Sequence, residues 1–133
     1  MSITASCISA CGVCRFLHGK LDMEVVLNAT LAGGVSVGSS SDLVVTAGIA
    51  MAIGALSGII SALGFLKLNG WLREKFGLFD TCGVHNLHGI PGILGALIGC
   101  FSAGWADLAF TKEDDTELLN TFAALKDGRT TKQ

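Results

Sequence analysis

The sequence predicts an all-α, polytopic membrane protein, with about three transmembrane helices preceded by the end of another. Half of its 133 residues are hydrophobic and only 15% are charged, and its mean hydropathy is +0.60. These values are unusual for a soluble domain. The charges also leave long gaps between them. The eighteen glycines favour membrane helices that pack closely, because glycine weakens a helix in water.

The gaps between charges define the expected helices in chain order. Residues 3–17 are apolar or small apart from Arg15, so the basic residues lie at the end of this stretch, as at the end of a helix and unlike a signal peptide. Residues 25–41 are uncharged but contain Asn, Thr and Ser, which predicts a helix inside a bundle. Two further gaps, at 43–66 and 81–106, exceed the roughly twenty residues that cross a bilayer. Residues 1–106 are therefore expected to form a partial transmembrane domain.

The remaining charges predict which segments lie outside the membrane. The tail, residues 107–133, carries ten of the twenty charges, which is typical of a solvated extramembrane segment. Basic residues at 15–24 and 67–80 place those two segments on the cytoplasmic side by the positive-inside rule. With three spans, the tail is then extracytoplasmic. We expect a multi-pass protein of the plasma membrane.

Glycines four residues apart recur in each predicted span. They form the pairs Gly34 and Gly38, Gly54 and Gly58, and Gly95 and Gly99. Small residues at this spacing let two helix backbones approach closely. Three helices cannot hide all of these polar or glycine-lined faces from lipid, so the chain is expected to need further helices or a partner.

Several other classes of function receive little support. Nine basic against eleven acidic residues give no electrostatic footprint for nucleic acid. Cys7, Cys11 and Cys14 have a spacing that resembles the iron–sulfur loop of radical S-adenosylmethionine enzymes. Offsets of four and seven also align three small side chains on one helix face, and no sequence for a soluble barrel follows. Cys82 and Cys100 are expected to be structural. We expect no enzyme, no cofactor and no metal.

His85 and His88 are the candidate functional residues, because an ionisable side chain within a membrane span is costly and by default marks a polar path. They lie three residues apart, with Asn86 between them and Pro91 close by. Pro91 lacks an N–H and leaves the Leu87 carbonyl without its helical donor. A polar, irregular helix segment of this kind suits a permeation path. The alternatives are a hydrogen-bonded core histidine and an incomplete metal pair.

Two stretches of the chain, one from Asp80 to Gly95 and one within Gly19 to Gly38, resemble the Rh glycoprotein branch of the ammonium transporter (Amt/Rh) family. One is Asp80-Thr-Cys-Gly-Val-His-Asn-Leu-His-Gly-Ile-Pro-Gly-Ile-Leu-Gly95, which is similar to a late pore helix of Rh proteins. The other comprises Gly19-Lys-Leu-Asp-Met and Asn28-Ala-Thr-Leu-Ala-Gly-Gly-Val-Ser-Val-Gly38, similar to the segment before it. The resemblance covers the chain from about Gly19 to Gly99, and two separate long motifs make it specific.

The resemblance implies a homotrimer of channels, each an eleven- or twelve-helix bundle that passes ammonia, and in Rh members carbon dioxide, through an apolar lumen. His85 matches the second of two stacked pore histidines, and Asn28 is expected to line the same pore. His88 matches a position typical of the Rh branch and is a possible second polar residue of the pore region. Asp80 matches a carboxylate at the cytoplasmic start of the helix, where it is expected to cap the N-terminus, and Pro91 is expected to be structural.

The family's first pore histidine, its vestibule acid and its aromatic gate have no match in this chain. The sequence is therefore expected to be a fragment that holds the later part of one pore. An alternative function is a non-conducting membrane fragment that associates with full-length subunits through its small-residue helix faces.

Overall fold

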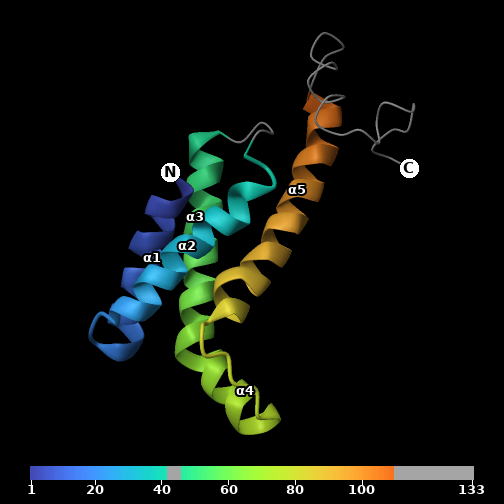
Figure 1. Ribbon diagram of the computed structural model, residues 1–133. Helices are drawn as coiled ribbons and strands as arrows, with labels where there is room; N and C mark the ends of the chain where they lie inside the picture. Colours follow the sequence, from blue (N-terminus) through green and yellow to red (C-terminus); the bar gives the residue numbers. More distant parts are fainter. Residues whose placement is uncertain (42–45, 110–133) are drawn as a thin grey trace.

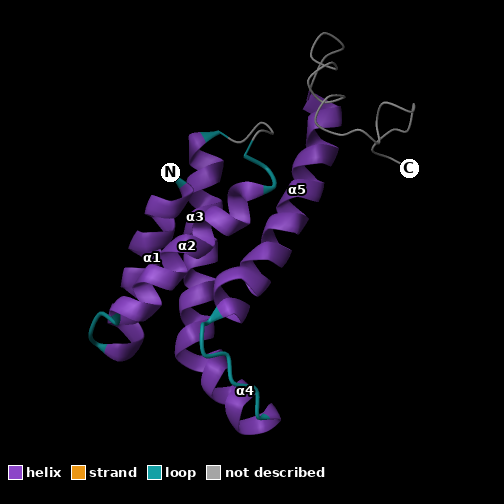
Figure 2. Ribbon diagram, viewed as in Figure 1, coloured by secondary structure: helices purple, strands orange, loops and turns teal. Residues whose placement is uncertain are grey.

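The structure is a computed structural model that describes residues 1–41 and 46–109. These two ranges are helical and contain no strand (Figure 2), which confirms the all-α prediction for the described part. The elements in chain order are α1 (Ser2–His18), α2 (Met23–Gly38), α3 (Ala47–Leu63), η1 (Gly64–Leu68), α4 (Asn69–Phe76), η2 (His85–Gly89) and α5 (Ile90–Ala109). Of the expected tail 107–133, residues 110–133 lie outside the described ranges, and residues 107–109 belong to α5.

α1 and α2 form an antiparallel hairpin joined by a short turn (Figure 1). Gly19 ends α1 in the left-handed region, with φ 69°, and its N–H donates to the Arg15 carbonyl. Glycine adopts this conformation without a steric penalty. Asp22 begins α2, because its Oδ1 accepts hydrogen bonds from the N–H groups of Glu24 (3.1 Å) and Val25 (3.4 Å).

Replacement of Asp22 with alanine is expected to destabilise the start of α2 by about 1 kcal/mol, because two N–H groups of the first turn lose their acceptor. Asp22→Asn retains an acceptor oxygen and should recover most of that stability. The measurement is the unfolding free energy of the 133-residue chain in micelles, followed by circular dichroism. Equal stability of the alanine and asparagine variants would contradict the cap.

One continuous helix of 30 residues, Ala47–Phe76, consists of α3, η1 and α4. The span predicted at 43–66 falls on its first part: residues 43–45 lie outside the described ranges, and the helix continues beyond residue 66 to Phe76. Thr46 caps the start, with Oγ1 accepting from the Ile49 N–H at 3.4 Å, and Gly77 ends it with φ 64°. The charges that follow residue 66 end the apolar stretch without interrupting the helix. At 1.5 Å per residue the helix is about 45 Å long.

The last helix also differs from its predicted bounds of 81–106. Helical structure begins at Val84 and continues through η2 and α5 to Ala109. Residues 81–83 form a turn instead. Gly83 has φ 64°, and its N–H donates to the Asp80 carbonyl at 3.3 Å. The turn reverses the chain, so the last helix runs back alongside the bundle (Figure 1).

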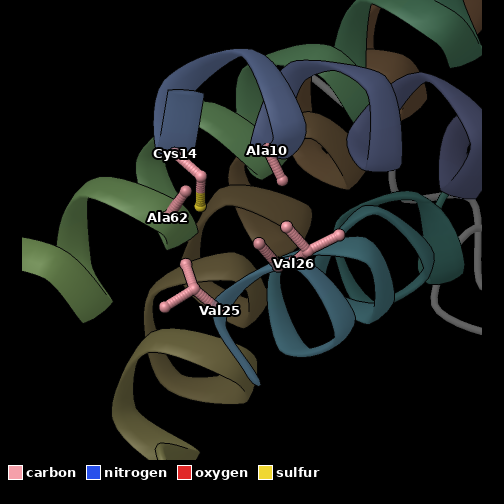
Figure 3. Close-up of a cluster of buried hydrophobic side chains, with 6 residues drawn as sticks. Ala10, Cys14, Val25, Val26 and Ala62 are labelled. Atoms are coloured by element: carbon pink, nitrogen blue, oxygen red, sulfur yellow. The ribbon is translucent and has the colours of Figure 1, made fainter. Parts of the chain in front are cut away.

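Most large apolar side chains lie outside, and apart from Ile53 and Leu87 the buried side chains are small or polar. Phe16, Leu97 and Phe101 are 94%, 54% and 77% exposed. The hydrophobic cluster between α1, α2 and α3 has no side chain larger than valine and consists of Ala10, Cys14, Val25, Val26, Ala29 and Ala62 (Figure 3). The buried polar residues are Ser2, Ser6, Ser36, Ser40, Ser57, Ser61 and Asn86. This distribution suits a bundle whose surroundings are as apolar as its own large side chains.

Two of the described helices are long and apolar enough to cross a membrane, namely Ala47–Phe76 and His85–Gly104. The segment predicted as a span at 25–41 forms the shorter helix α2, Met23–Gly38, of 16 residues. Its length of about 24 Å is less than the roughly 30 Å of a bilayer's hydrocarbon core. α2 therefore differs from the two long helices, although its buried face packs between α1, α3 and α5.

Two of the three predicted glycine pairs lie at helix contacts. A side chain at Gly54 would overlap the backbone of Ser2, and one at Gly58 would collide with Ser9 Oγ. Both glycines therefore bring α3 directly against α1. Gly95 and Gly99 similarly bring α5 against α2, where a Cβ at Gly95 would lie 3.0 Å from the Ser36 carbonyl oxygen and one at Gly99 would lie 3.2 Å from Ser39 Oγ.

The third pair is one residue out of register with the actual contact. Nothing lies within 4 Å of a Cβ at Gly38, and a Cβ at Gly34 would meet only the Ile3 side chain at 3.4 Å. Gly33 makes the close approach instead, where a Cβ would lie 2.5 Å from Ser6 Cβ. The closest approach of α2 to α1 therefore lies one residue before the predicted pair, while Gly34 makes an ordinary van der Waals contact with α1.

Candidate functional site

The predicted irregular segment around the two histidines is a π-helical turn. Its five residues, His85–Gly89, form η2 at the start of the last helix. The Ile90 N–H donates to the His85 carbonyl, which spans one residue more than an α-helical hydrogen bond. Pro91 follows at once and has no N–H to donate to Leu87. The π-helical turn is thus compatible with the hydrogen-bonding gap that Pro91 creates.

Asp80 lies at the N-terminus of this helix, in front of η2. Its Oδ2 accepts a hydrogen bond from the His85 N–H at 2.8 Å, and its Oδ1 accepts one from the Val84 N–H at 3.0 Å. These are N–H groups that the helix itself leaves without an acceptor. A carboxylate there also interacts favourably with the helix dipole. The backbone of His85 is therefore held at its N–H by Asp80 and at its carbonyl by Ile90.

The turn separates exposed from buried side chains. His85 and His88 are exposed, whereas Asn86 and Leu87 between them are buried. The helix thus presents both imidazoles away from its contacts with α2 and the long helix. Asn28, the other predicted pore residue, is half-buried, and its amide donates to the Glu24 carbonyl of its own helix at 3.0 Å. Within the described residues, no hydrogen bond brings Asn28 together with His85.

Serine hydroxyls link the His85 helix to its neighbours. Ser36 of α2 and Ser57 of α3 share a hydrogen bond of 2.7 Å between their Oγ atoms. Ser57 Oγ also donates to the Ala32 carbonyl at 2.9 Å, and Ser36 Oγ lies 3.2 Å from the Pro91 carbonyl. The side chain of Pro91 is fully buried at this junction. Three helices therefore meet through two hydroxyls close to the π-helical turn.

The sequence indicates that serines lie inside the bundle and that Asn86 lies between the histidines, but not which partners these side chains bond. Ser39 Oγ donates to the Gly95 carbonyl at 2.7 Å, and Ser61 Oγ donates to the Asn86 carbonyl at 2.9 Å. The Asn86 side chain is fully buried and donates through Nδ2 to Asn69 Oδ1 at 2.6 Å. The available signal was the recurrence of Ser and Asn inside charge-free stretches, since polar side chains there must face other helices.

The cysteines form no metal site within the part of the chain that the structure describes. Cys7, Cys11 and Cys14 lie along α1, with Cys14 buried and the other two half-buried. No group of three His, Cys, Asp or Glu side chains in residues 1–41 and 46–109 is placed to hold a metal ion. Cys14 packs in the hydrophobic cluster instead (Figure 3). Cys82 and Cys100 are free and exposed.

The described fold is a helical bundle in which consecutive helices run in opposite directions, with small polar interfaces, an apolar exterior and a π-helical turn that carries two histidines, and these features are those of a polytopic membrane protein. The sequence model of the Ammonium Transporter Family matches residues 1–124. The chain belongs to this family, and its similar relatives are Rh proteins.

The chain is similar to Rh proteins of animals and of a bacterium. It is 44% identical to ammonium transporter Rh type C of Rattus norvegicus, in a match that covers 80% of this chain and 22% of the relative. It is 50% identical to ammonium transporter Rh type B of Sus scrofa, over 79% of this chain and 23% of the relative. The solved structure of Nitrosomonas europaea Rh50 matches with a TM-score of 0.70 and 35% identity, over 90% of this chain and 30% of that one. The chain thus spans between about a fifth and a third of these relatives' lengths.

Proposed function

We propose that this chain forms part of a channel that conducts ammonium or ammonia across a membrane, with His85 in the wall of the path. The observation that carries the proposal is the exposed imidazole of His85 on a π-helical turn of an apolar helix, with the backbone held by Asp80. An exposed histidine in a membrane helix needs a polar path or a partner to face. The names of the relatives, which are ammonium transporters, support ammonium as the solute.

The chemistry of imidazole fits this solute. A cation is costly at the middle of a bilayer, whereas neutral ammonia is far less so. Imidazole both donates and accepts hydrogen bonds and exchanges protons near neutral pH. We propose that His85 hydrogen-bonds ammonia after the ammonium ion has released its proton to water at the entrance of the path, and that His88 is a second polar group of the same region. Carbon dioxide, also neutral, is a second solute of the proposed path. Apart from this reversible exchange of a proton, the solute is not converted into another compound, so the proposed activity is transport rather than catalysis.

The proposed topology is multi-pass, in the plasma membrane, with segments 15–24 and 67–80 in the cytoplasm and 107–133 outside the cell. The α1–α2 turn and α4 lie toward the same end of the bundle, low in Figure 1. In α4, Lys75 Nζ lies 5.1 Å from the ring centre of Trp71, and Trp71 and Phe76 are 48% and 60% exposed. Exposed aromatic and basic residues together are typical of the membrane–water interface.

The parent protein is proposed to be a homotrimer in the lipid bilayer, with its remaining helices facing His85. The alternative, a non-conducting chain that associates with full-length subunits, loses its main contact surfaces. Its glycine faces at Gly54 and Gly58, and at Gly95 and Gly99, are occupied by α1 and α2 of the same chain. Gly38 alone keeps an open side among the residues of the three pairs.

A chimaeric protein, referred to as the graft, tests the proposal by placing this chain's residues in a full-length relative. In the Sus scrofa Rh type B protein, the segment matched by this chain is replaced with this chain's residues, and the graft is reconstituted in liposomes containing a pH-sensitive dye. An inward ammonium gradient should raise the internal pH faster than in protein-free liposomes, because entering ammonia takes up a proton. The 133-residue chain alone serves as the comparison and should give the protein-free rate. A graft that is inserted and folded but no faster than protein-free liposomes would refute the proposal.

A further inference from the structure

The residue after His85 is held by three contacts from a single helix. Ser61 Oγ donates to the Asn86 carbonyl at 2.9 Å, and Asn86 Nδ2 donates to Asn69 Oδ1 at 2.6 Å. Gly64 lies directly against the Asn86 side chain, so that a Cβ at position 64 would be 3.2 Å from Asn86 Cβ and would overlap Oδ1. All three contacts come from the helix Ala47–Phe76. The Asn86 side chain is fully buried between them.

The other π-helical turn, η1, places Asn69 where it can contact Asn86. On a regular α-helix, the face that carries residues 61 and 64 next carries residue 68. η1, from Gly64 to Leu68, contains an i to i+5 hydrogen bond from the Asn69 N–H to the Gly64 carbonyl, which adds one residue to the turn. Asn69 therefore takes the place that Leu68 would otherwise occupy. The π-helical turn in one helix supplies the acceptor for the π-helical turn in the other.

Stability alone does not account for an amide at position 86. Among the described residues, Asn86 Oδ1 has no hydrogen-bond partner although it is buried. A buried carbonyl without a donor costs free energy, whereas an apolar side chain of similar volume would not carry this cost. Unlike an apolar residue, the Asn86 amide provides a directional hydrogen bond to Asn69.

We propose that Asn69 and Asn86 form a positioning pair that sets the direction of the His85 imidazole by fixing the rotation of the π-helical turn. His85 and Asn86 are consecutive, so the rotation that buries one side chain turns the other outward. The His85 N–H is bonded to Asp80 and its carbonyl to Ile90, and the Asn86 amide fixes the remaining rotation of the turn. The inference rests on the proposed function, in which His85 lines the path, but its geometry does not depend on which solute passes.

Nitrogen NMR of the histidine rings tests the pair in the complete 133-residue chain. The chain has three histidines, His18, His85 and His88, so selective ¹⁵N-histidine labelling in lipid bilayers gives a spectrum that single His→Gln variants assign. Asn69→Leu removes the acceptor at similar volume and should shift the ring nitrogens of His85 while leaving those of His18 unchanged. Asn69→Asp keeps an acceptor oxygen and should restore the wild-type position of His85.

A matched control removes a hydrogen bond of equal length elsewhere. Thr30 Oγ1 donates to the Val26 carbonyl at 2.6 Å within α2, and Thr30→Val should leave His85 unshifted. If Asn69→Leu does not fold, Gly64→Ala serves instead. It lies on the same helix as Asn69, places a methyl group against Asn86 Oδ1 and should shift the His85 ring nitrogens. Unchanged His85 resonances in a folded Asn69→Leu or Gly64→Ala chain would overturn the proposal, as would an equal shift in Thr30→Val. Shifted His85 resonances in Asn69→Leu, together with a flux that His85→Ala leaves unchanged in the graft, would support the positioning pair and refute the proposed function.

Discussion

Replacement of His85 with alanine in the Rh type B graft is expected to lower ammonium-driven flux by roughly two- to tenfold, because a lost hydrogen bond to a neutral solute costs roughly 0.5–1.5 kcal/mol. The imidazole is the side chain that the π-helical turn presents outward. Alanine leaves the path with no group there that can donate, accept and exchange a proton. The measurement is the initial rate of internal alkalinisation in dye-loaded liposomes, normalised to the amount of inserted protein.

His18 provides the matched control for this substitution. It is exposed at the end of α1, next to the turn at Gly19 and away from the π-helical turn. His18→Ala should therefore leave the flux unchanged. His85→Ala should also leave the helix content unchanged, because the bonds at position 85 that hold the turn come from the backbone N–H and carbonyl. A folded His85→Ala graft with unaltered flux would show that His85 does not line the conducting path.

The second large effect is expected from Gly54→Ala, which should destabilise the packing of α3 against α1 by about 1–3 kcal/mol. The added methyl group would overlap three backbone atoms of Ser2, namely the carbonyl oxygen, the carbonyl carbon and Cα. A backbone obstacle cannot rotate away as a side chain can, so the two helices must separate. If Ser2 moves to make room, the hydrogen bond of 2.6 Å from Ser2 Oγ to the Gly33 carbonyl of α2 is weakened as well. Reversible unfolding of the 133-residue chain in mixed micelles measures the loss.

Gly48→Ala is the matched control, because it makes the same chemical change in the same helix. Nothing lies within 4 Å of a Cβ at Gly48, so the substitution should stabilise α3 by roughly 0.5–1 kcal/mol through helix propensity alone. The two variants should thus change stability in opposite directions. Equal effects of Gly54→Ala and Gly48→Ala would mean that α3 does not lie against α1 at this position.

The helices could be predicted from the sequence because lipid excludes charge, so the gaps between charges mark apolar helix. The same reasoning ends the long helix too early, since the charges after residue 66 are compatible with a helix that continues into the interface. The histidine segment and its irregular backbone were also predictable, because Pro91 removes a hydrogen bond whatever surrounds it.

The Asn69–Asn86 pair and its two π-helical turns could not be predicted in the same way. A π-helical turn shifts the helix faces by one residue, and the shift depends on contacts between segments far apart in the chain. The close approach of Gly33 rather than Gly34 or Gly38 to α1 has a similar origin. The face of α2 that meets α1 depends on the rotation of the whole helix, which glycine spacing alone does not specify.

The placement of small and polar residues inside and large apolar residues outside has a consequence for how this bundle responds to temperature. When a soluble domain unfolds, apolar surface enters water and the heat capacity rises, which gives its stability a maximum near room temperature. When these helices separate within a bilayer, Phe16 and Phe101 are exposed beforehand, and the newly uncovered surface meets lipid rather than water. The heat-capacity change of helix separation is therefore small. The association free energy of these serine- and glycine-lined helices should then vary almost linearly with temperature, without weakening in the cold.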